Sequence, residues 1–196
     1  IRDGANQADC VAFFKTTEPQ TGRGALIYAK ALSSLGQEKF AQTVIINAWR
    51  SLRMSTAEEL DFMAGYKSLL TPHHEARLEQ ALWQGWRGNA KSMLAYLPKA
   101  TQSLGKARLG LMTDARGVDA LIAAVPKHLK NHPGLAYARF SWRLRKDLQD
   151  RATALLLAHS KSKSTLGRPK HWAKQRQDLV RANLRAKKYR RAYSIA

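Results

Sequence analysis

One short phrase recurs along this chain and constrains the fold more than any other feature. In each copy a helical run ends in a tight polar or glycine turn, and an alanine follows inside a new helical run. A single helix hairpin of this size cannot bury its own apolar face, so successive hairpins must stack on one another. The four copies centre on Gly36 and Ala41, Gly88 and Ala90, Asp147 and Ala152, and Lys187 and Ala192.

The rest of the pattern agrees with a helical chain. No stretch alternates apolar and polar residues as a strand does, whereas apolar residues recur at helical spacing from residue 25 onward. The copies of the phrase are unevenly spaced, so we predict an all-α fold, an irregular α-solenoid or superhelix of stacked hairpins. Residues 1–23 contain several helix breakers and are predicted to be a loosely ordered N-terminal segment, followed by one scaffold domain over 24–196.

Local signals place individual helices. The sequence S-T-A-E from Ser55 to Glu58 is a capping box that predicts a helix start, and Thr71 with Pro72 predicts another. The stretch 161–170 is rich in serine and lysine and predicts an exposed loop. The periodicity predicts helices over about 25–35, 37–52, 56–70, 72–84, 88–97, 99–112, 118–125, 134–146, 148–159 and 169–186.

Charge is the second strong feature of the chain. The formal net charge is +20, and residues 101–196 hold 22 Lys and Arg against five Asp and Glu, a net of +17, which leaves +3 for residues 1–100. Such a field attracts polyanions, which include nucleic acid, anionic lipid and anionic cell-wall polymer. The alternative interpretation is a basic protein whose charged side chains are hydrated on exposed helix faces and bind no partner.

Other bulk properties narrow the classes of protein. No apolar run approaches the length of about 20 residues that a transmembrane helix needs, so we predict no transmembrane segment. The single Cys10 excludes an internal disulfide framework. Because the chain begins at Ile1 rather than methionine, we expect a processed or excised piece of a longer protein.

Few residues resemble a catalytic or metal site. Zinc ligands on a helix need a spacing of four, whereas His73 and His74 are adjacent and point to different faces. His128 and His132 have that spacing, but no third ligand is near in the sequence. The acids Glu58, Glu59 and Asp61 lie at a predicted helix start, where acidic residues favour the helix dipole. We therefore predict no metal, no cofactor and no catalytic residue in this chain.

Candidate binding residues come from charge and turn position. Most of the five tryptophans are expected in the core, while Trp86 lies between Gly85 and Gly88 in a turn and is the one expected at the surface. The basic C-terminal helices supply the other candidates for substrate binding: Arg176, Arg181, Arg185 and Lys188. No base-reading motif or stacking platform is recognisable among them, so nucleic acid is not the expected partner.

Three segments together resemble a known family. The segment LTPHHEARLEQALWQGWRGNAKSML at 70–94 resembles the stretch L-T-P-x-x-H-x-x-R-x-[DE]-x-L-L-W-x-G in the helical N-terminal region of alphaproteobacterial soluble lytic transglycosylases, with His74 one residue out of step. The segments 117–157 and 167–193 are similar to later parts of the same region, in the family's order. The residues of the first segment that match are Leu70, Thr71, Pro72, His74, Arg77, Leu78, Leu82, Trp83 and Gly85.

The resemblance implies a superhelical scaffold whose parent enzyme carries a C-terminal lysozyme-like domain. That domain, a lyase acting on murein, cleaves the glycosidic bond between N-acetylmuramic acid and N-acetylglucosamine without water and leaves an anhydro-sugar end. Its marks are a Glu-Ser pair and a Gly-Leu-Met-Gln stretch. Neither occurs in this chain, where Gly110 to Thr113 matches only the first three residues of the Gly-Leu-Met-Gln stretch. The resemblance therefore implies a scaffold without its catalytic domain, incomplete at the C-terminus.

We accordingly expect a non-catalytic, periplasmic scaffold of a peptidoglycan lytic transglycosylase. Its expected partners are peptidoglycan glycan strands and the missing catalytic domain, and stem-peptide carboxylates would be the counter-charges of the basic surface. Two alternatives stay open. One is a non-enzymatic α-solenoid adaptor that binds an acidic protein partner. The other is a basic module that binds a polyanion, nucleic acid included.

Overall fold

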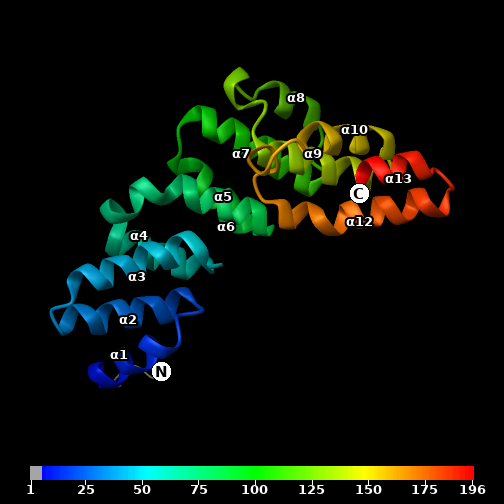
Figure 1. Ribbon diagram of the computed structural model, residues 1–196. Coiled ribbons are helices and arrows are strands. Elements are labelled where there is room, and N and C mark those ends of the chain that lie inside the picture. Colours follow the sequence, from blue (N-terminus) through cyan, green and yellow to red (C-terminus); the bar gives the residue numbers. More distant parts are fainter. Residues whose placement is uncertain (1–5) are drawn as a thin grey trace. The chain divides into compact units, whose positions relative to one another are not determined.

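The computed structural model describes residues 6–196, and all regular secondary structure in that range is helical (Figure 1). The prediction of an all-α fold is confirmed. The described chain forms two compact units, residues 6–97 and 98–196, and the predicted extent of one scaffold domain over 24–196 stays a prediction. Within each unit successive hairpins stack, whereas the superhelical course of the whole chain stays a prediction.

The first unit contains hairpins that pack on one another through α3 and α5 and through α2 and α4. The predicted capping box at Ser55 and Glu58 is present at the start of α4. The elements of this unit are α1 (Gln7–Thr16), α2 (Gly22–Ser34), α3 (Glu38–Ser51), α4 (Thr56–Leu70), η1 (Thr71–His73), α5 (His74–Gln84), α6 (Arg87–Met93) and η2 (Leu94–Tyr96).

In the second unit α9 packs on α7 and α10, and α10 packs on α13. Phe140 and Trp172 stack with ring centroids 5.0 Å apart at the centre of its core. The predicted loop at 161–170 contains one helical turn, where the Ser162 hydroxyl caps Thr165. The elements are α7 (Lys99–Thr113), α8 (Val118–Ala123), η3 (Lys127–Leu129), α9 (Pro133–Arg145), α10 (Gln149–His159), α11 (Lys163–Leu166), α12 (Pro169–Arg185) and α13 (Tyr189–Ile195).

The recurring phrase corresponds to one turn geometry that joins four helix pairs. In each turn a residue with positive φ ends the first helix, and the next backbone N–H donates to a carbonyl five residues earlier at 2.8 to 2.9 Å. This is the bond pattern of a Schellman C-cap. The alanine five residues after the left-handed residue is at most 2% exposed in all four copies. The left-handed residues are Gly36, Gly85, Asp147 and Lys187, which join α2 to α3, α5 to α6, α9 to α10 and α12 to α13.

The sequence placed one of these turns wrongly. Gly88 was expected to form the second turn, but the left-handed residue is Gly85, with φ of 75°, and Gly88 lies inside α6. The corrected position puts Ala90 five residues after the turn, as in the other three copies.

The N-terminal segment is more ordered than the sequence indicated. Residues 1–23 were expected to be loosely ordered; residues 1–5 lie outside the described part, and residues 7–16 form α1. Cys10, Val11 and Phe14 are buried, and the Phe14 ring lies 5.0 Å from that of Tyr28 on α2. Burial against α2 therefore stabilises a helix that local sequence signals do not predict.

Candidate binding surface

The four basic residues predicted from the sequence lie on one hairpin of the second unit. Arg176, Arg181 and Arg185 belong to α12, and Lys188 is the N-cap residue of α13. Trp86 belongs to the first unit, where it is half-buried at the N-cap of α6. The structure thus groups the basic residues on α12 and α13, which form the last hairpin, and assigns Trp86 to another part of the chain.

Two of these basic side chains have partners within the hairpin. The Arg176 Nε donates to the carbonyl of Ile195 and so ties α12 to the end of α13. Arg181 lies 3.8 Å from the Asp178 carboxylate one helical turn away, and both side chains are exposed. An exposed pair of this kind contributes little to stability, but it lowers the positive charge that Arg181 presents to a partner.

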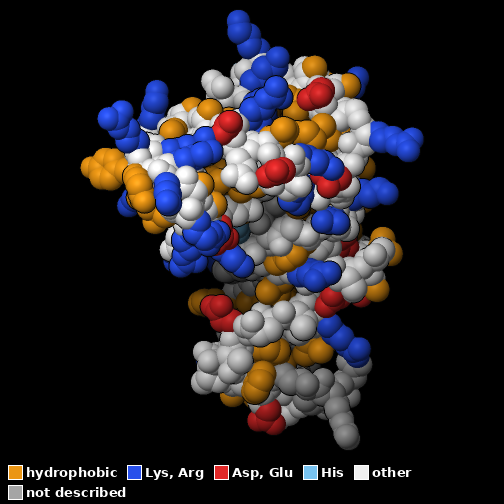
Figure 2. All heavy atoms as spheres, turned by 90° about the vertical axis from the view of Figure 1, so that its right-hand side faces the viewer, with side chains coloured by type: hydrophobic (Ala, Val, Ile, Leu, Met, Phe, Trp, Pro, Cys, Tyr) orange, Lys and Arg blue, Asp and Glu red, His pale blue; other side chains and the backbone are white. Residues whose placement is uncertain are grey.

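Four other cations of the last hairpin have no such ties. They surround the turn at Lys187 and are exposed, and within residues 6–196 none of them forms an ion pair or a side-chain hydrogen bond. The hydrogen bond and the charge of Arg191, helped by the charge of Lys188, lower the pKa of the Asp150 carboxyl group. The charges of the four cations are therefore available to an anionic partner. These residues are Arg185, Lys187, Lys188 and Arg190. Figure 2 shows how densely Lys and Arg side chains are distributed over the surface of the second unit.

Exposed apolar side chains accompany these cations. Tyr193 is 88% exposed, Tyr189 is 63% exposed and Leu184 is 47% exposed. Tyr189 and Tyr193 are four residues apart on α13 and so share one face of that helix. Together with the four free cations, these three residues make up what we call the basic–aromatic surface.

Comparison of the four equivalent turns shows that Tyr189 and Tyr193 occupy positions that are polar in the other three hairpins. Tyr189 lies two residues after the left-handed residue, where the other hairpins have Glu38, Arg87 and Gln149. Tyr193 lies six residues after it, where the others have Gln42, Lys91 and Thr153. Leu184 lies three residues before it, at a position where Leu82 is buried and Leu144 packs against the core. The last hairpin therefore exposes aromatic groups where the other hairpins have polar ones.

Lys187 and Arg190 belong to the basic C-terminal helices that the sequence already indicated, whereas neither Tyr189 nor Tyr193 was predicted as a binding residue. The objection to an aromatic platform rested on the absence of a recognised motif. Alignment of the four turns would have revealed the tyrosines, because they break a pattern of polar residues. Their exposure, by contrast, depends on the packing of α13 and has no local sequence signal.

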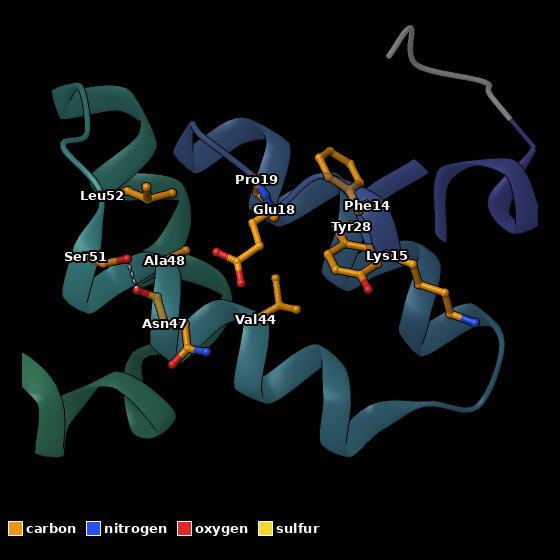
Figure 3. Close-up of a pocket in the computed structure, with 10 residues that line it drawn as sticks. All are labelled: Phe14, Lys15, Glu18, Pro19, Tyr28, Val44, Asn47, Ala48, Ser51 and Leu52. Atoms are coloured by element: carbon orange, nitrogen blue, oxygen red, sulfur yellow. Dashed lines mark hydrogen bonds between the residues drawn. The ribbon is translucent and has the colours of Figure 1, made fainter. Parts of the chain in front are cut away.

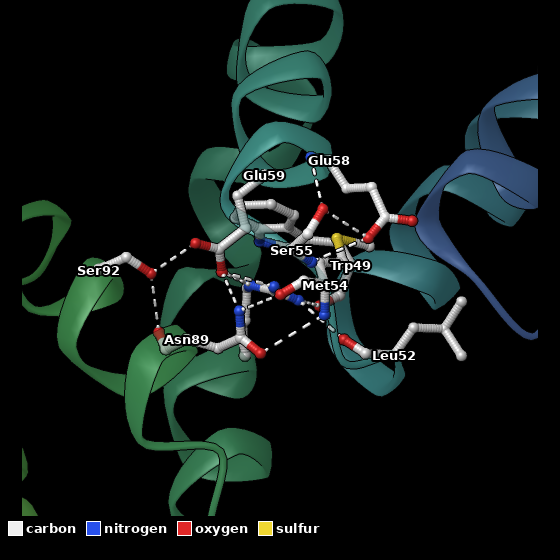
Figure 4. A network of polar contacts seen from close by, with 9 residues as sticks. Trp49, Leu52, Met54, Ser55, Glu58, Glu59, Asn89 and Ser92 are labelled. Carbon is white, nitrogen blue, oxygen red and sulfur yellow. Dashed lines mark hydrogen bonds and ion pairs between the residues drawn. The ribbon is translucent and has the colours of Figure 1, made fainter.

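The acidic cluster of the first unit is a structural network (Figure 4). The Arg77 Nη2 donates to the Glu59 carboxylate at 2.7 Å, and the Arg77 Nη1 donates to the Trp49 carbonyl at 2.6 Å. Asn89 and Ser92 also donate to Glu59, at 2.9 and 2.7 Å. Glu59 on α4 thus accepts hydrogen bonds from α5 and α6, and Arg77 extends the network to the end of α3.

The neighbouring ionisable groups also have structural partners. Burial tends to raise the pKa of Glu58, but hydrogen bonds from Ser55 and from the backbone of Arg23 and Gly22 outweigh it and lower that pKa. Burial lowers the pKa of Arg77, and its hydrogen bond and ion pair with Glu59 oppose that shift. Both groups thus have hydrogen-bond partners within this part of the first unit.

Two of the histidines have structural contacts. The ring of His74 is buried between those of Trp49 and Tyr96, at 5.7 and 5.2 Å, and burial followed by the charge of Arg77 lowers its pKa. His132 accepts the backbone N–H of Gly134 and caps α9. Among residues 6–196, no three His, Cys, Asp or Glu side chains are placed to hold a metal ion together.

The geometry defines an all-helical protein of stacked hairpins with one basic–aromatic surface. None of its helices within residues 6–196 is long and apolar enough to span a membrane. No protein-family model, curated protein or solved structure matches this chain.

Proposed function

We propose that this chain is the non-catalytic helical scaffold of a periplasmic peptidoglycan lytic transglycosylase and that it binds glycan strands. The observation that carries the proposal is the pair of exposed tyrosines, Tyr189 and Tyr193, among four unpaired cations. Tyrosine presents a flat apolar face on which a sugar ring packs, and its hydroxyl stays in water. The carboxylates of stem peptides would pair with the surrounding Lys and Arg side chains.

The burial of the segment at 70–94 supports a scaffold role. The residues that carry the resemblance to the transglycosylase family are those that build the joint between α4, α5 and α6. Leu70, His74, Arg77, Leu78, Leu82 and Trp83 are buried there, and Gly85 forms the left-handed turn. A pattern made of core and turn residues is what two proteins of the same helical architecture would share, whatever their chemistry.

The proposal is tested by retention of the whole chain on purified insoluble peptidoglycan at low and high salt, with double-stranded DNA as competitor. We expect retention at high salt that DNA does not reduce. The double variant Y189S/Y193S should lower the affinity about tenfold, because two aromatic contacts are lost. The matched control is Leu60→Ser, which removes a side chain that is 64% exposed on the first unit.

Release by salt or by DNA would instead support the second candidate, a module that binds polyanions. The net charge of +17 over residues 101–196 favours that function. In that case affinity would fall steeply with salt concentration, and the tyrosine variant would behave like the control.

A further inference from the structure

A pocket of about 350 Å³ opens within the first unit, over α2 and between α1 and α3 (Figure 3). Its apolar lining includes Phe14, Tyr28, Val44 and Ala48. Its polar lining consists of Lys15, Glu18, Asn47 and Ser51. The Ser51 hydroxyl donates a hydrogen bond to the backbone carbonyl of Asn47. None of the residues that line this pocket belongs to the basic–aromatic surface.

The polar groups are arranged as two opposite charges at separate places. In Figure 3 the Glu18 carboxylate points into the space beside Val44 and Ala48, whereas the Lys15 chain runs past Tyr28 in the other direction. Neither charge forms an ion pair with another side chain in residues 6–196. The side-chain amide of Asn47, which both donates and accepts, also points to solvent at the pocket wall.

These groups select a ligand by charge and size. An unpaired carboxylate beside aromatic and aliphatic side chains favours an ammonium group, and the separate lysine favours a carboxylate. A neutral sugar would pair with neither charge, and a polyanion would be repelled by the Glu18 carboxylate. The volume is at the small end of the range for small-molecule pockets, about 300–1,000 Å³.

We propose that this pocket binds a short zwitterionic peptide. Its free ammonium group pairs with Glu18, its carboxylate pairs with Lys15, and an aliphatic side chain lies over Val44 and Tyr28. Asn47 donates to or accepts from the peptide bond. This site does not depend on glycan binding by the basic–aromatic surface, so each proposal fails or stands without the other.

The test is an NMR titration of the full ¹⁵N-labelled chain with the dipeptide Ala-Leu. The dipeptide has no net charge, so the +20 field of the protein does not attract it by itself. We expect saturable shifts confined to residues that line the pocket, with a Kd of about 1 mM, as befits a small ligand in an open site.

Paired changes in ligand and protein identify each contact. N-acetylation of Ala-Leu removes the ammonium group and should weaken binding about fivefold in the wild type but not in Glu18→Gln. Amidation removes the carboxylate and should weaken binding similarly in the wild type but not in Lys15→Met. The matched controls are Glu75→Gln and Lys67→Met, which remove exposed charges of the same unit outside the pocket.

Several results would overturn the proposal. One is the absence of saturable shifts at the pocket in the millimolar range. Another is equal binding of Ala-Leu and its acetylated form, which would show that Glu18 does not recognise an ammonium group. Binding of free leucine as tight as that of Ala-Leu would reject the peptide and leave a single amino acid as the ligand.

Discussion

At the scale of single residues, the guanidinium of Arg77 decides how the first unit is held together. The residue is 2% exposed, it lies 4.2 Å from the centre of the Trp49 ring, and it bonds to two backbone carbonyls and to Glu59. An arginine has five donors in a fixed plane, so it can bridge several elements at once where a lysine cannot.

Removal of this cation should therefore be costly. In Arg77→Met the Glu59 carboxylate would stay buried without its counter-ion, so we expect the free energy of unfolding of the first unit to fall by about 3–5 kcal/mol. Urea unfolding followed by tryptophan fluorescence measures the change. Arg50→Met, which removes an exposed arginine on α3, is the control and should change stability by less than about 0.5 kcal/mol. A loss in Arg77→Met as small as that of the control would contradict the structural role of the network.

At the scale of the helix hairpin, the position of the left-handed residue is the main determinant. Gly85 has φ of 75°, a conformation that side chains with a Cβ adopt at a cost, whereas Gly88 is helical and has open space where a Cβ would be. The two glycines are three residues apart in the same stretch, yet their substitutions should have opposite effects.

We expect Gly85→Ala to lower the free energy of unfolding by about 1 kcal/mol, because alanine is strained in the left-handed region. Gly88→Ala should raise it by about 0.5–1 kcal/mol, because alanine has less backbone freedom than glycine to lose when this helical position is ordered. Both changes add one methyl group, so each variant serves as the control of the other in thermal unfolding measured by circular dichroism. Equal signs for the two variants would mean that the turn is not where the structure places it.

This pair of glycines also shows which features of the fold can be predicted from local sequence signals. Helix starts such as Ser55 with Glu58 were predicted because their signals are local. The choice between Gly85 and Gly88 was wrong, because both fit a glycine-rich turn and only the packing of Ala90 separates them. The bond from Asn89 to Glu59 joins residues 30 positions apart, and no local pattern indicates it.

The candidate surface was predictable only in part, for the same reason. Charge counts pointed to the last hairpin, and Arg185 and Lys188 are indeed exposed there. Whether a given arginine is free, however, depends on its partner. The Arg176 side chain bonds to a carbonyl 19 residues away, which a sequence does not show. The exposure of Tyr193 likewise follows from which face of α13 is buried through Ala192 and Ile195.

At the scale of the whole molecule, charge divides the chain into two units of different character. Residues 98–196 hold 23 Lys and Arg against five Asp and Glu, a net of +18, and residues 1–97 hold 11 against nine, a net of +2. Mutual repulsion among the charges of the second unit destabilises its folded state, and salt screens that repulsion. The stability of the first unit depends instead on its buried network, on which salt acts little.

Salt should consequently stabilise one unit and not the other. On going from about 20 mM to about 500 mM NaCl, we expect protection against hydrogen exchange to rise in peptides of residues 98–196 and to change little in those of residues 1–97. Mass spectrometry of exchanged peptides resolves the two units within the full chain. The charge-reversal variant R185E/K188E should weaken the salt response of the second unit, because it removes four units of positive charge from the last hairpin. An equal response of both units would mean that the asymmetric charge carries no energetic cost in the folded protein, and that its role is confined to attracting a partner.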